Sequence, residues 1–191
     1  MKFGILGGSF NPVHLGHLLL AQEAKEMLGL ERVFFIPYSQ PPHKSADGLL
    51  QSSHRLEMIR LAIRGNPSFE ASDIEMKRGG VSYSVDTLRH LRKEFPSASF
   101  YFLIGSDAFQ GLYAWKEAEE LFRLCRFVIA ERPRFPLKDL PPQILRLPMP
   151  QLDISSKDIR QRLEEGKSIQ YLVPEPVRDY LEKKRLYLPG G

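Results

Sequence analysis

The first 37 residues follow the order of a parallel βαβ unit. An apolar run over residues 2–6 ends at Gly7-Gly8, and apolar residues then recur at helical spacing from Leu15 to Leu28. A second apolar run over residues 32–36 follows. Two parallel strands joined through a helix belong to a sheet whose faces are covered by helices. This order therefore restricts the chain to an α/β fold.

The rest of the chain continues this alternation. Apolar spacing predicts further helices over residues 52–63, 85–94, 116–124 and 155–165, and one from about 174. It predicts further strands over residues 69–72, 74–76, 100–104, 127–130 and 144–147. No repeat or long linker divides the sequence. We therefore expect one domain over residues 1–191, a doubly wound parallel sheet flanked by helices, which binds ligands at the carboxyl ends of its strands.

Composition excludes several other classes of protein. The chain is 42% hydrophobic and 26% charged, as ordinary globular proteins are. Its longest apolar run, residues 100–104, is far shorter than the roughly 20 residues of a membrane span, and the apolar stretch at the N-terminus is too short for a signal peptide. The single cysteine, Cys125, lies in an apolar setting typical of a buried structural thiol. We expect a cytoplasmic protein with no membrane partner.

The segment from Gly7 to His17 carries the strongest chemical signal. It matches neither common glycine-rich phosphate motif, but it joins the first strand to the first helix, where phosphates bind in such folds. Gly7 and Gly8 let an anion approach the backbone amides. His14 and His17 stand three residues apart, so both rings can lie on one face of the helix start and donate hydrogen bonds to developing charge. The net charge of +4 also favours an anionic ligand.

Each part of this segment has a simpler interpretation. The glycine pair could form only a tight turn, and Asn11 is read as a turn residue. A histidine at a helix start is often a capping or surface residue. Two histidines at this spacing could be half of a zinc site, but no cysteine or third histidine stands at ligand spacing. The sequence therefore assigns no protein ligand to a metal.

A second phosphate-binding candidate lies near the C-terminus, over residues 154–160. It reads Ile-Ser-Ser-Lys-Asp-Ile-Arg, a predicted helix start with two hydroxyl groups and a guanidinium group one turn later. Such an arrangement can hold a diphosphate or triphosphate. Alone, it would be read as a serine-capped helix with an exposed arginine. Lys157 either adds a phosphate contact or points to solvent.

Together, these two segments resemble the nucleotidyltransferase superfamily that carries a His-x-Gly-His signature. The resemblance implies a Rossmann-like sheet and transfer of a nucleotidyl group from a nucleoside triphosphate. Further segments, in the same order along the chain, are similar to the nicotinate-mononucleotide adenylyltransferases: residues 37–44, 80–88, 104–109 with Trp115, 132–133 and 171–174.

This resemblance implies a reaction and a set of site residues. AMP would pass from ATP to nicotinate mononucleotide in NAD biosynthesis, giving nicotinate adenine dinucleotide and pyrophosphate, with Mg²⁺ carried on the ATP phosphates. The implied catalytic residues are His14, His17, Lys44 and Arg160. The implied ATP-binding residues are Gly7, Gly8, Ser9, Phe10, His14, His17, Gly105, Asp107, Ile154, Ser155, Ser156 and Arg160. The implied acceptor-binding residues are Lys44, Tyr83, Ser84, Thr87 and Trp115.

Four alternatives follow from the same residues. Pantetheine-phosphate adenylyltransferases and cytidylyltransferases share the His-x-Gly-His core, but should lack the Pro-Pro-His-Lys and Tyr-Ser-x-Asp-Thr-Leu segments. Nicotinamide mononucleotide is an alternative acceptor. A nucleic-acid-binding module or tRNA synthetase fragment would fit the pI near 9.2, but the positive charges are scattered. A nucleotide sensor without activity conflicts with the intact histidines. We expect no nucleic-acid partner, and the sequence leaves open whether the chain forms a homo-oligomer.

Overall fold

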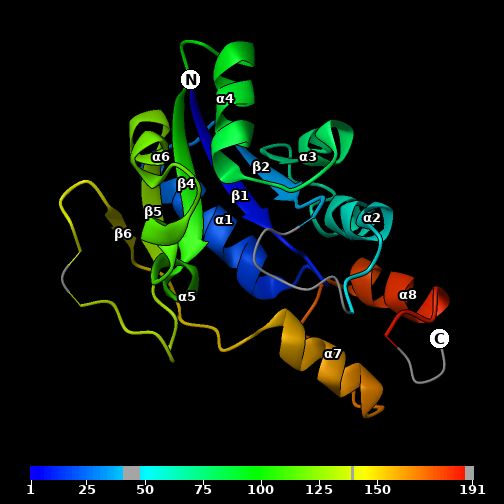
Figure 1. Ribbon diagram of the computed structural model, residues 1–191. Helices are drawn as coiled ribbons and strands as arrows, with labels where there is room; N and C mark the ends of the chain where they lie inside the picture. The colour runs from blue at the N-terminus through cyan, green and yellow to red at the C-terminus, as the bar shows by residue number, and fades with distance from the viewer. Residues whose placement is uncertain (41–47, 139, 188–191) are drawn as a thin grey trace.

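The computed structural model describes residues 1–40, 48–138 and 140–187, which build a six-stranded parallel sheet with helices on both faces (Figure 1). The strands are β1 (Lys2–Gly8), β2 (Arg32–Pro37), β3 (Phe69–Ala71), β4 (Ser99–Gly105), β5 (Arg126–Ala130) and β6 (Leu145–Leu147). The helices are α1 (Leu15–Leu28), α2 (Ser52–Ala62), α3 (Ile74–Arg78), α4 (Ser84–Glu94), α5 (Ser106–Phe109), the 3₁₀ turn η1 (Leu112–Ala114), α6 (Ala118–Leu124), α7 (Ser156–Glu164) and α8 (Glu175–Lys183).

The strand order is β3-β2-β1-β4-β5-β6, so the first strand lies in the middle of the sheet. Gly4 in β1 is paired with Val33 in β2 on one side and with Tyr101 in β4 on the other. The chain builds outward from β1 in one direction and then, from β4, in the other. The carboxyl ends of β1 and β4 therefore border the point where the winding reverses, which is where doubly wound sheets bind ligands.

Two apolar layers cover the sheet because side chains alternate between its faces. In β2, Val33 and Phe35 pack on the face covered by α1, α2, α7 and α8. Phe34 and Ile36 pack on the opposite face, with α4 and α6. A strand buried on both sides reads as an unbroken apolar run, which is why the sequence predicts β2 so clearly.

The predicted fold class is confirmed, and one predicted element is wrong. Residues 74–76 were expected to form a strand, but they begin the short helix α3. The amides of Lys77 and Gly79 bond back to the carbonyls of Asp73 and Glu75. Lys77 also pairs with Asp73 one helical turn earlier, at 3.0 Å. Three residues of alternating polarity fit a strand and a helical turn equally well, so local pattern could not separate the two.

Cys125 is buried, as predicted, immediately before β5. Its thiol donates to the carbonyl of Leu121 at 3.3 Å, and burial raises the pKa of this thiol to about 12. A thiol that stays protonated in this way is a structural group. Within the described part of the chain, none of the helices has the length and apolar character needed to cross a membrane.

Gly4 has the closest neighbours of the three glycines in β1, so enlarging it tests the packing. A Cβ atom there would lie 2.9 Å from Leu30 Cδ1 and 3.1 Å from Val33 Cγ2, both in buried side chains. We expect Gly4→Ala to lower the free energy of unfolding by about 1–3 kcal/mol, as overpacking does. Urea denaturation followed by circular dichroism measures the change.

Gly111→Ala is the matched control. A Cβ at Gly111 would meet only the carbonyl of Ala108, at 3.9 Å. This substitution should change the free energy of unfolding by no more than about 0.5 kcal/mol. Equal effects at the two glycines would contradict the close packing of β1 against Leu30 and Val33.

Candidate active site

The loop over residues 8–14 leaves β1 and enters α1, and Arg55 of α2 holds its first half. The Arg55 guanidinium is buried, and its Nη1 donates to the carbonyl of Ser9 at 3.0 Å. Its Nη2 and Nε donate to the carbonyls of Tyr38 and Leu50, at 2.7 and 2.9 Å. One buried cation thus fastens this loop to the two chain segments that flank residues 41–47. It also satisfies carbonyl groups that would be costly to bury without a partner.

The second half of the loop is held by α7. Arg160 Nη1 donates to the carbonyl of Asn11 at 2.8 Å, and Ser156 Oγ donates to the carbonyl of Pro12 at 2.8 Å. Ser155 Oγ accepts from the amide of Asp158 and so caps the helix. The structure therefore brings the two predicted phosphate-binding segments together. The Ser155 and Ser156 hydroxyls, the Asp158 amide and one Arg160 nitrogen bind the protein itself. Among the described residues, this leaves the amides of Ser156 and Lys157 and the rest of the guanidinium for a ligand.

Asn11 is more than the turn residue that the sequence indicated. Its buried side chain donates from Nδ2 to the carbonyl of Gly48 at 2.8 Å, and its Oδ1 accepts from the amide of Leu50 at 3.1 Å. The same oxygen accepts from the hydroxyl of Tyr187. This amide side chain thus joins the loop to the start of α2 and to the last described residue of the chain.

The two predicted histidines lie together at the start of α1. His14 is the N-cap of the helix and His17 occupies its first turn, with ring centroids 3.7 Å apart and planes inclined by 30°. A Cβ on Gly16 would lie 3.1 Å from the Cε1 and Nδ1 atoms of His14. The glycine between the histidines therefore gives the first ring its place beside the second.

Both imidazoles are neutral at physiological pH. Burial, with a smaller contribution from the positive charge of Arg132, lowers the pKa of His14 to about 3. Burial also lowers the pKa of His17 well below 6.5, and His14 and Arg132 add to the effect. The amide of His14 donates to Nδ1 of His17 at 3.2 Å, so a neutral His17 carries its proton on Nε2. Nδ1 of His14 is buried and has no hydrogen-bond partner among the described residues.

Arg132, which follows β5, connects the ends of three elements. Its Nη1 pairs with Asp107 Oδ2 at 2.9 Å, and its Nη2 donates to the carbonyl of Ile154 at 2.6 Å. Its amide donates to the hydroxyl of Ser106 at 2.9 Å. A Cβ on Gly105 would lie 2.4 Å from Asp107 Oδ1, so the glycine gives this carboxylate its position. The other carboxylate oxygen of Asp107, Oδ1, does not pair with Arg132 Nη1 and can accept a hydrogen bond.

The predicted acceptor segment lies at the start of α4. Tyr83 is the N-cap, and the amides of Asp86 and Thr87 turn back to its carbonyl. The amides of Ser84 and Val85 precede the first bond within the helix, so they can receive an anion. Trp115 is half-buried, and its ring meets those of Phe102 and Phe127 edge-on.

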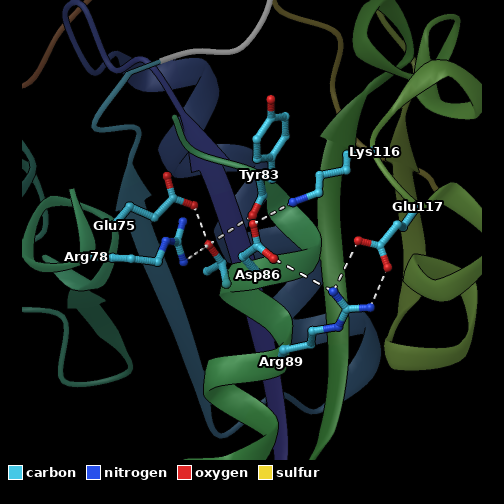
Figure 2. Close-up of polar contacts among 8 residues, drawn as sticks. Glu75, Arg78, Tyr83, Asp86, Arg89, Lys116 and Glu117 are labelled. Carbon is cyan, nitrogen blue, oxygen red and sulfur yellow. Dashed lines mark hydrogen bonds and ion pairs between the residues drawn. The ribbon is translucent and has the colours of Figure 1, made fainter. Parts of the chain in front are cut away.

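The hydroxyl of Thr87, which was predicted to bind the acceptor, has partners within the protein. This buried hydroxyl donates to Oε1 of Glu75 at 2.6 Å and accepts from Arg78 Nη1 at 3.2 Å (Figure 2). Burial raises the pKa of Glu75, whose Oε2 lacks a partner within the described residues. The Thr87 side chain therefore fixes α4 to α3.

Sequence reasoning did not assign several residues that shape this site. Lys44, which it did assign, lies outside the described residues. Arg55 and Tyr187 gave no signal, because each acts on a segment distant in sequence. Arg132 did have a sequence signal, because it follows the end of a predicted strand, at the edge of the sheet where ligands bind.

Comparisons with known proteins find relatives of the whole chain. A family model described as cytidylyltransferase-like matches residues 5–162. A probable nicotinate-nucleotide adenylyltransferase of Geobacter metallireducens is 43% identical, covering 98% of each chain. One from Thermus thermophilus is 44% identical, covering 98% of this chain and all of its own. The nicotinic acid mononucleotide adenylyltransferase of Plasmodium falciparum, complexed with NaAD, has the same fold, with a TM-score of 0.84, 24% identity and 97% of both chains covered.

The neutral imidazoles predict how stability depends on pH. Both pKa values are lower in the folded chain than the ordinary 6.5, so below pH 6.5 the unfolded chain binds more protons. The stabilisation is complete above that pH and is lost as pH falls, toward about 3 for His14. Each imidazole should contribute up to about 1.4 kcal/mol per pH unit.

Urea denaturation from about pH 7 to about pH 4.5 measures this slope. The double variant His14→Gln/His17→Gln should have a shallower slope, because its side chains do not titrate. If the two proteins lost stability in parallel over this range, the imidazoles would not be the neutral, buried groups described above.

Proposed function

This chain belongs to the nicotinate-nucleotide adenylyltransferase family, and from that premise we propose that it transfers AMP from ATP to nicotinate mononucleotide. The products are nicotinate adenine dinucleotide and pyrophosphate. The observation that carries the proposal is the stacked pair of neutral imidazoles at the start of α1, where β1 and β4 end. His17 offers an Nε2–H donor there, and the unpartnered Nδ1 of His14 marks a polar site that a ligand completes.

The chemistry requires positioning and charge stabilisation. A phosphate oxygen of the mononucleotide attacks the α-phosphorus of ATP, a new P–O bond forms, and the bond to the pyrophosphate oxygen breaks in line. The attacking phosphate is already an anion, so no general base is needed. Negative charge grows on the oxygens around the α-phosphorus and on the leaving pyrophosphate. The imidazole of His17 and the amides of Gly7 and Ser9 lie at the end of β1 to receive it.

The remaining ATP contacts follow from the geometry around Arg132. The free oxygen of Asp107 accepts a hydroxyl of the adenosine ribose while Arg132 holds the carboxylate in place. The start of α7 offers the amides of Ser156 and Lys157, and the guanidinium nitrogens of Arg160 that Asn11 does not use, to the outer phosphates. Ser155 and Ser156 support them by fixing the helix and the loop. Lys44 is proposed to reach the phosphates from residues 41–47.

Mg²⁺ fits this site as an ion that the triphosphate itself binds. The described groups around the phosphate position are mainly donors: amides, an imidazole N–H and guanidinium nitrogens. Among the described residues, no three His, Cys, Asp or Glu side chains gather to hold a metal ion. Mg²⁺ prefers oxygen ligands and keeps several waters. We therefore propose that phosphate oxygens and water hold it, and that it supplies charge neutralisation there.

The acceptor lies at the start of α4. A ring carboxylate at the amides of Ser84 and Val85 receives two hydrogen bonds and the positive end of the helix dipole. The half-buried Trp115 offers a surface on which the pyridine ring stacks. Tyr83 flanks this position, and Thr87 fixes the helix to Glu75.

Replacing His17 tests the charge stabilisation directly. We expect His17→Ala to lower kcat by about 100- to 1,000-fold, as loss of one donor to a developing oxyanion does. Pyrophosphate release from ATP and nicotinate mononucleotide measures it. His90→Ala, at an exposed position of α4, is the control and should retain normal turnover. Normal kcat in a folded His17→Ala protein would remove the imidazole from the mechanism.

A panel of acceptors tests the substrate. Pyrophosphate release should be fastest with nicotinate mononucleotide, slower with nicotinamide mononucleotide, and absent with phosphopantetheine or a phosphorylated alcohol. The physical reason is the fit of a planar acidic ring between Trp115 and the start of α4. Faster release with phosphopantetheine would contradict the proposed acceptor while leaving the nucleotidyl transfer intact.

A further inference from the structure

Lys116 places a positive charge over the first turn of α4. It immediately follows Trp115, and its Nζ lies 4.4 Å from the centre of the Tyr83 ring and 3.2 Å from Oδ2 of Asp86. Tyr83 is the N-cap of α4 and Asp86 is its third residue. Figure 2 shows the lysine reaching across from the segment before α6 toward this helix start. The ammonium therefore lies beside the amides proposed to receive the ring carboxylate.

The Lys116 ammonium has hydrogen-bond donors that Asp86 does not use. An ammonium group has three donors, and Asp86 takes one of them. Asp86 also faces Arg89, whose Nη1 lies 3.8 Å from its Oδ1. Arg89 in turn donates to Oε1 of Glu117 at 3.2 Å (Figure 2). If the lysine shifts toward a ligand, Asp86 still faces a cation. The Lys116 side chain is 41% exposed, so its stem has room to move.

We propose that Lys116 is a specificity-determining residue that contacts the ring carboxylate of nicotinate mononucleotide. This inference rests on the proposed function. The two pyridine mononucleotides differ at the ring by one negative charge, and helix amides alone can donate to the oxygen of either a carboxylate or an amide. A nearby ammonium attracts the charged form more strongly than the neutral amide. The carboxamide of nicotinamide mononucleotide would also place its own N–H donors against the N–H donors of the protein, which disfavours its binding.

The size of the effect follows from the exposure of the lysine. A charge-assisted hydrogen bond is stronger than a neutral one, but solvent weakens pairs near the surface. We expect Lys116→Met to lower the ratio of kcat/KM for the acid to kcat/KM for the amide by about tenfold. The change should appear mainly as a higher KM for the acid. Lys116→Arg keeps the charge and should retain most of the ratio.

Asp86→Asn gives a prediction of opposite sign. Removing the carboxylate that competes for Lys116 leaves the ammonium free for the ligand, so the acid-to-amide ratio should rise by a few fold. Lys93→Met, which removes an exposed lysine near the other end of α4, should leave the ratio unchanged. Salt should lower the ratio of the unsubstituted enzyme more than that of Lys116→Met, because it screens the charge.

The experiment is pyrophosphate release from ATP with each mononucleotide, for the unsubstituted enzyme and the four variants. A lower ratio in Lys116→Met, with recovery in Lys116→Arg, supports the proposal. An unchanged ratio in Lys116→Met overturns it, and so does a proportional loss with both substrates, which indicates a structural role. If the unsubstituted enzyme releases no pyrophosphate with either mononucleotide, the proposed function fails, which is a separate result from an unchanged ratio.

Discussion

The loop between β1 and α1 keeps its shape because side chains from other parts of the chain bond to its carbonyl groups. The carbonyls of Ser9, Asn11 and Pro12 accept from side chains of α2 and α7. A peptide group has a donor and an acceptor on opposite sides, and a buried carbonyl needs a partner. Each of these partners comes from outside the loop. The shape of the proposed phosphate site therefore depends on contacts between segments up to 149 residues apart.

The charged side chains that surround this loop are positive. Arg55, Arg132 and Arg160 gather near it, and together with burial the positive charge of Arg132 keeps both imidazoles neutral. A neutral imidazole is still a donor, and the amide of His14 fixes which nitrogen of His17 carries the proton. The site thus offers imidazole donors whose protonation state does not change near neutral pH.

Several residues that the motifs single out use their side chains to bind other parts of the protein. Thr87 belongs to a segment that resembles an acceptor site, but its hydroxyl binds Glu75. Ser156 belongs to a segment that resembles a phosphate site, but its hydroxyl binds the carbonyl of Pro12. A motif points to a segment of the chain. It does not reveal which atoms are already engaged by neighbouring elements.

The sequence by itself determined the α/β class, the position of the loop after the first strand, and the histidine pair with the glycine between them. These features depend on neighbours within a few residues, through strand and helix periodicity and the space that a missing Cβ leaves. Only the tertiary structure decided that Arg55 and Arg160 hold the loop, that Arg132 pairs with Asp107, and that Lys116 lies over the start of α4. Their partners are brought near by the winding of the sheet, so no local pattern encodes them.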